Sequence, residues 1–157
     1  MKTNKIKKVL IALDYDPTAK KVAEAGVALA KAMEAEITLL HVIVDPSLYA
    51  SAYDSMGVWQ IDKEYTLDTF ENIKSSSRHF LEKAKRHLGD PTIQTIQKEG
   101  DFAYSILETA NELDIDIIVM GSHSHKWLEN IIMGSVTEEV LRKSTIPLFI
   151  VPTKKRE

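Results

Sequence analysis

Cysteine is absent from this chain of 157 residues. Disulfide bonds, catalysis by a thiolate and zinc sites built on cysteine are therefore excluded. The apolar runs are too short to span a bilayer, and the lysine-rich start leads to no apolar stretch with a small-residue cleavage site. An excess of positive charge is missing as well, because the formal net charge is −3, so no global positive field draws the chain to nucleic acid. We therefore expect a cytoplasmic protein with neither a membrane nor a nucleic-acid partner.

Strands and helices alternate along a length that suits one domain, residues 1–157. The stretch KKVLIALD, residues 7–14, is almost continuously apolar, which is typical of a parallel strand covered by helices on both faces. Asp16 and Pro17 then predict a helix start, with Asp16 as N-cap and Pro17 as the first helical residue. Further strands are predicted over residues 36–43, 92–100, 115–120 and 147–151, and helices over residues 18–35, 63–88, 101–113 and 135–143. The alternation predicts an α/β fold, a single doubly wound, Rossmann-like sheet of five parallel strands with helices on both faces.

Four segments reach the carboxyl edge of this sheet, where open α/β sheets bind ligands at the reversal of strand order. They are Asp14, Val42, Gly121 and the pair Gly134–Ser135. Between the second strand and the long helix, residues 45–62 are rich in turn formers and lack a clear period. A connection of this length is either a functional loop or a mobile one.

The stretch MGSHSHKWLENIIMGS, residues 120–135, carries a glycine near each end of a loop. Gly121 follows a strand, where glycine permits a positive φ and a close approach of ligand to backbone. Gly134 and Ser135 precede a helix, whose free N–H groups and positive dipole end favour a phosphate. A turn glycine followed by an ordinary helix N-cap explains the same residues equally well. Neither a P-loop nor a G-x-G-x-x-G run after the first strand is present, so a nucleotide would be held by this fourth strand–helix loop.

The spacing of this loop resembles the universal stress proteins, whose ATP-binding branch carries G-x2-G-x9-G-[ST] after the fourth strand. Gly121, Ser124 and Gly134–Ser135 match that spacing, with serine in place of the middle glycine. The stretches KKVLIALD, ITLLHVI, EGDFAYSILETANELDIDIIVMGS and TIPLFIVP resemble the family's segments in the same order, so the likeness covers nearly the whole chain. The resemblance implies an adenine-nucleotide α-hydrolase-like fold with strand order 3-2-1-4-5, and a regulatory role in the stress response.

The resemblance also implies a site for ATP, with AMP or ADP as alternative ligands and Mg²⁺ as an accompanying ion. At the nucleoside end, Ala12 would form part of the adenine wall and Asp14 would hold the ribose or the adenine. Val42 would meet the adenine through its backbone, and Met120 and Gly121 would line the ribose.

At the phosphate end, the resemblance implies that Gly134, Ser135 and Val136 present N–H groups and a hydroxyl to the phosphates. Ser124 supplies the same N–H as the glycine it replaces, at a cost of about 1 kcal/mol if the backbone there is left-handed. We expect weakened but surviving ATP binding. The family's other branch loses these glycines and is not known for binding ATP, which leaves a nucleotide-independent, homodimeric interaction scaffold of the same fold as the alternative.

Three histidines invite other interpretations. His123 and His125 form an H-x-H pair, but no further ligands accompany them, so loop polarity is favoured over a dedicated metal site. His41 lies inside the second strand, and a structural, hydrogen-bonded histidine is favoured there over a catalyst. A G-x-S-x-G elbow is absent and no nucleophile–base pair stands out, so we assign no catalytic residue and expect at most slow ATP hydrolysis.

The C-terminal strand predicts a homodimer. An apolar strand at the edge of a sheet exposes unpaired backbone groups, which natural proteins avoid. In the family that the chain resembles, this strand pairs across a two-fold axis. We therefore expect a homodimer through Pro147–Pro152, with Phe149 and Val151 as candidate contacts.

Overall fold

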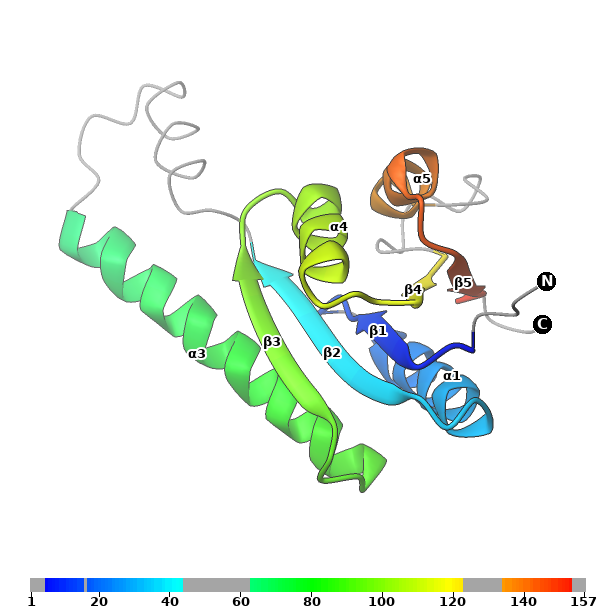
Figure 1. Ribbon diagram of the computed structural model, residues 1–157. Helices are drawn as coiled ribbons and strands as arrows, with labels where there is room; N and C mark the ends of the chain where they lie inside the picture. The colour runs from blue at the N-terminus through cyan, green and yellow to red at the C-terminus, as the bar shows by residue number, and fades with distance from the viewer. Residues whose placement is uncertain (1–4, 16, 44–62, 123–133, 154–157) are drawn as a thin grey trace.

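The computed structural model describes residues 5–15, 17–43, 63–122 and 134–153. One sheet of five strands, all paired in parallel, has the order β3-β2-β1-β4-β5 (Figure 1). The strands are β1 (Lys8–Ala12), β2 (Glu36–Ile43), β3 (Gln94–Glu99), β4 (Ile117–Gly121) and β5 (Leu148–Val151). The predicted α/β fold and strand order are confirmed.

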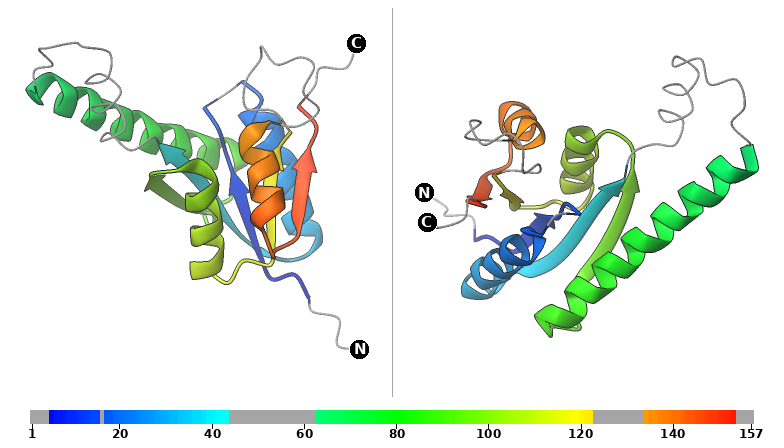
Figure 2. Two further views of the ribbon diagram at one scale, coloured as in Figure 1. Left: turned by 90° about the horizontal axis from the view of Figure 1, so that it is seen from above. Right: turned by 180° about the vertical axis from the view of Figure 1, so that it is seen from behind.

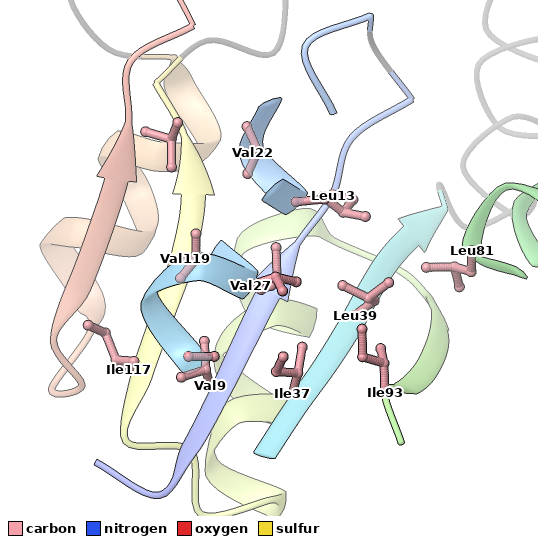
Figure 3. Close-up of a cluster of buried hydrophobic side chains, with 14 residues drawn as sticks. Val9, Leu13, Val22, Val27, Ile37, Leu39, Leu81, Ile93, Ile117 and Val119 are labelled. Carbon is pink, nitrogen blue, oxygen red and sulfur yellow. The ribbon is translucent and has the colours of Figure 1, made fainter. Parts of the chain in front are cut away.

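Helices cover both faces of the sheet, α1 and α3 on one side and α4 and α5 on the other (Figures 1 and 2). The helices are α1 (Ala19–Ala32), α3 (Lys63–Leu88), α4 (Phe102–Glu112) and α5 (Ser135–Lys143). Side chains along β1 alternate between two cores: Val9 and Ile11 join the α1–α3 cluster shown in Figure 3, and Leu10 joins the α4–α5 cluster. Both faces of β1 are therefore buried, which is why its sequence is apolar without a break.

The start of α1 differs from the prediction. Thr18 is the N-cap and Ala19 is the first helical residue, so the assignment of Asp16 as N-cap and Pro17 as first helical residue is wrong. The first helical hydrogen bond runs from the N–H of Val22 to the carbonyl oxygen of Thr18 at 3.1 Å. The φ of proline suits a turn as well as a helix, so the pattern locates a helix start only to within one or two residues.

Two helices end in left-handed residues that are not glycine, Glu34 after α1 with φ 55° and Asp114 after α4 with φ 54°. The N–H of Ile115 bonds back to the carbonyl oxygen of Ala110 at 2.9 Å, as in the Schellman motif. We expect Asp114→Gly to raise the free energy of unfolding by about 1 kcal/mol, because glycine carries no Cβ penalty in this region. Denaturation in urea measures this. Glu112→Gly, in the last turn of α4, is the control and should instead lower stability; a loss for both variants contradicts the prediction.

Candidate functional site

A cavity of about 130 Å³ opens at the carboxyl edge of the sheet, where β1 and β4 lie side by side. This is roughly ten times the space that a single bound water needs. From β1 the chain passes to α1 on one face of the sheet, and from β4 it passes to α5 on the other. The cavity therefore lies at the reversal of strand order, where open α/β sheets bind their ligands.

Predicted site residues from four separate segments line this cavity together. They are Ala12, Asp14, Val42, Met120, Gly121 and Val136. Gly134 and Ser135 directly precede Val136 at the start of α5. Ser124 lies outside the described residues. The fold thus gathers residues that are more than 100 positions apart in the chain, from Ala12 to Val136, into one cavity.

One wall of the cavity is apolar. Leu40 and Val42 contribute from β2, Met120 contributes from β4, and Phe102 and Ile106 contribute from the first turns of α4. An apolar wall with a few polar groups around it is the usual environment of a flat heterocyclic ligand. Phe102 and Ile106 were not among the predicted site residues, because their contribution depends on how α4 crosses the sheet. The apolar stripe of α4 was visible in the sequence, but it does not reveal which of its residues reach the edge.

Asp14 supplies the acidic group at the cavity. It follows β1 and is exposed, and its Oδ1 accepts a hydrogen bond from the N–H of Tyr15 at 2.8 Å. The described lining of the cavity contains neither lysine nor arginine. An anionic ligand would therefore be held there by backbone N–H groups, by hydroxyls or by an accompanying cation.

The amino end of α5 supplies such N–H groups. Gly134 is its N-cap, with φ −63° and ψ 156°, and the N–H of Gly134 donates to the carbonyl oxygen of Ser122 at 2.6 Å. This N–H is therefore already used, which revises its predicted role at the phosphates. Helix geometry leaves the N–H groups of Ser135, Val136 and Thr137 without partners inside α5. Ser135 is the first helical residue, so its hydroxyl is not the N-cap that we considered as the alternative.

The carboxyl end of β4 is tied firmly to α5. Gly121 is a strand residue paired with Val151 and lies outside the left-handed region, so the positive φ suggested for it is wrong. The reason is that the strand pairing continues one residue further, since the N–H of Ser122 donates to the carbonyl oxygen of Val151 at 2.9 Å. Thr137, which is buried, donates its hydroxyl to the carbonyl oxygen of Gly121 at 2.9 Å. The predicted close approach of a ligand to Gly121 is compatible with its place in the cavity lining.

His41 is a structural residue beside the site, as we expected. Its side chain is buried, its Nδ1 forms a hydrogen bond with the hydroxyl of Ser77 in α3, and its ring lies 5.2 Å from that of Phe80. Burial lowers the pKa of His41, and the carboxylate of Asp14 opposes this shift. The described residues hold no group of three or more side chains suited to a metal ion. The pair His123 and His125 lies outside those residues.

These features define an α/β protein with a ligand cavity at the strand-order reversal. A model of the universal stress protein family matches residues 5–152, and the chain belongs to this family. It is 31% identical to universal stress protein YxiE of Bacillus subtilis, over 92% of this chain and 97% of the relative. It is 26% identical to universal stress protein A of Escherichia coli K12, over 96% of this chain and 97% of the relative.

Solved structures share the fold of this chain. The structure of hypothetical protein MJ0577 matches with a TM-score of 0.75 at 27% identity, covering 98% of this chain and all of that one (100%). A universal stress protein in complex with cAMP matches with a TM-score of 0.65 at 18% identity, covering 96% of this chain and 99% of that one. Across the part of the chain that the structure describes, no helix combines the length and the apolar character needed to cross a membrane.

Proposed function

We propose that this universal stress protein is a cytoplasmic regulatory module of the stress response that binds an adenine nucleotide, with ATP as its principal ligand. One observation carries the proposal: a single cavity joins an apolar wall to the amino end of α5. The wall suits the adenine base, and the free N–H groups of α5 suit phosphate oxygens. A universal stress protein of the same fold, 18% identical to this chain, is described in complex with cAMP.

The residues present fit such a ligand in three respects. Val42 and Met120 offer apolar surface for a base, and Asp14 offers an exposed acceptor for ribose hydroxyls or the adenine amino group. Ser135 starts a helix of nine residues with its side chain exposed, so its hydroxyl is accessible to a phosphate, and its N–H has no partner inside α5. Because the described lining has no lysine or arginine, we propose that Mg²⁺ accompanies ATP and offsets part of the triphosphate charge.

Calorimetric titration with ATP and Mg²⁺ tests this proposal directly, and AMP and ADP tested in parallel reveal how many phosphates the site recognises. A ligand that binds only the folded protein also raises the melting temperature, by mass action. Absence of both signals at millimolar ATP would reject nucleotide binding. It would favour a nucleotide-independent interaction scaffold, a possibility raised by Ser124, which stands at the middle glycine position of the motif.

Asp14→Ala is expected to weaken ATP binding roughly tenfold while leaving pyrophosphate binding within about twofold of the parent. The proposed partner of Asp14 is the nucleoside, and a hydrogen bond to a charged group contributes about 1.5–3 kcal/mol. Calorimetry with both ligands measures the difference. Asp90→Ala is the control, since Asp90 accepts the N–H of Thr92 in the turn before β3 and does not line the cavity. Equal losses of ATP and pyrophosphate affinity in Asp14→Ala would contradict the assignment.

We also propose a homodimer through Pro147–Pro152. β5 is an edge strand in the sheet order, and Phe149 at its middle is 37% exposed. An exposed aromatic side chain on a strand at the edge of the sheet favours association with a second copy of the chain.

A further inference from the structure

Ser122 is the residue at which three separate parts of the chain are joined. It directly follows β4, and its backbone carbonyl oxygen accepts the N–H of Gly134, the N-cap of α5, at 2.6 Å. Its own N–H donates to the carbonyl oxygen of Val151 at the end of β5. Its side-chain Oγ accepts the N–H of Thr153 at 3.0 Å and lies 3.2 Å from the hydroxyl oxygen of Thr153. Both backbone groups and the hydroxyl of Ser122 are therefore engaged within the protein.

These hydrogen bonds connect the residues after β5 to the N–H groups of α5 that we propose as phosphate donors. Thr153 holds the side chain of Ser122, and the carbonyl of Ser122 holds the N-cap of α5. The carbonyl oxygen of Gly134 in turn accepts the first helical hydrogen bond of α5, from the N–H of Glu138 at 2.9 Å. The N–H groups that follow Gly134 take their direction from this end of the helix.

We infer that Ser122 and Thr153 are positioning residues for the phosphate end of the nucleotide, through which the segment after β5 sets the direction of the donors on α5. This inference rests on the proposed nucleotide binding. It does not require Ser122 to be a ligand, because its role acts through the contacts of its hydroxyl with Thr153. These contacts also connect the phosphate end of the site to the carboxyl end of the edge strand β5. A second copy of the chain bound at β5 and the nucleotide would therefore change each other's binding affinity by the same factor.

Two substitutions remove the same pair of contacts from opposite sides. Ser122→Ala removes the acceptor, and Thr153→Pro removes the donor N–H together with the hydroxyl while leaving Ser122 intact. We expect each to weaken ATP binding roughly three- to tenfold, as for the loss of one or two modest hydrogen bonds. Adenosine, which lacks phosphates, should bind each variant within about twofold of the parent. The double variant should lose no more ATP affinity than either single variant, because both act on one contact.

Two controls separate positioning from general stability. Thr153→Ser keeps the N–H and a hydroxyl and should bind ATP as the parent does. Ser144→Ala removes two hydrogen bonds, to the N–H and the carbonyl oxygen of Ile146, at the opposite end of α5. It should leave the affinities for both ATP and adenosine unchanged. Equal losses for ATP and adenosine in Ser122→Ala would mean a merely structural role, and parent-like ATP binding by Thr153→Pro would make Ser122 itself a ligand; either result overturns the inference.

Amide hydrogen exchange gives a readout that needs no ligand. Ser122→Ala and Thr153→Pro should each speed exchange of the Gly134 N–H several-fold relative to the parent, whereas Ser144→Ala should not. If the parent binds no ATP, the proposed function fails, while faster exchange still shows that this contact holds the amino end of α5. Unchanged exchange in both variants rejects the inference whether or not ATP binds.

Discussion

Gly134→Val is expected to lower the affinity for ATP at least about a hundredfold while the protein remains folded. Gly134 has φ −63° and ψ 156°, an extended backbone that valine adopts readily. Its N–H would still donate to Ser122. The branched side chain, however, stands beside the N–H groups of Ser135 and Val136 and keeps phosphate oxygens away from them. Loss of two hydrogen bonds to a charged group corresponds to about 3 kcal/mol or more, hence the hundredfold change.

Calorimetric titration with ATP measures this loss, and circular dichroism with thermal melting verifies the fold. Ser135→Val is the matched control, because it places the same side chain one residue further along at an exposed position. It exchanges the hydroxyl for two methyl groups beyond the N-cap and should weaken ATP binding at most about tenfold. Adenosine should bind Gly134→Val about as well as it binds the parent. Parent-like ATP affinity in folded Gly134→Val would remove α5 from the site.

Much of this architecture could be predicted because its signals are local. The continuous apolar run that became β1 and the alternation of strands with helices were sufficient for a parallel, doubly wound sheet. The strand order followed from the resemblance to a family. The cavity-lining residues found in advance, such as Asp14 and Gly121, lie at the end of a strand or within two residues of it, so the rule for ligand binding at the carboxyl edge was enough to place them.

The features that could not be predicted depend on contacts between distant segments. Phe102 and Ile106 reach the cavity only because α4 packs over β2. The N–H of Gly134 is occupied only because Ser122, which directly follows β4, meets the N-cap of α5. The periodicity of the sequence does not reveal such a hydrogen bond. An N–H group at a predicted helix start can therefore be expected to be free and yet have a partner in the folded protein.

The edge strand shows the same limit. Phe149 and Val151 were both predicted as candidate contacts, from the apolar character of this edge strand and the resemblance to a family. In the structure Phe149 is 37% exposed, whereas Val151 is 4% exposed and belongs to the core cluster that includes Val22 and Val119. Val151 is therefore wrong as a side-chain contact for a partner. Burial along a strand depends on which helix covers each position, and the alternation alone does not contain that information.

Val151→Lys should consequently lower the stability of the fold far more than Phe149→Lys does. Lysine at position 151 must place an ammonium group among apolar side chains, where it has no partner, or force the strand away from the core. We expect a loss of roughly 3–5 kcal/mol in the free energy of unfolding, measured by denaturation in urea. Phe149 is 37% exposed, so lysine at position 149 can keep its ammonium group in solvent and should cost only about 1 kcal/mol, through the apolar contact that is lost.

Phe149→Lys should instead weaken the proposed dimer. If β5 pairs with its counterpart across a two-fold axis, Phe149→Lys exchanges an exposed aromatic contact for two like charges near that axis. The dimer dissociation constant should then rise roughly tenfold or more. Sedimentation velocity over a range of micromolar concentrations measures this constant for the parent and for Phe149→Lys, both of them folded. A parent that sediments only as a monomer would reject the dimer. A dimer that Phe149→Lys leaves unchanged would move the interface away from this face of β5, because Phe149 is the residue of β5 with an exposed side chain.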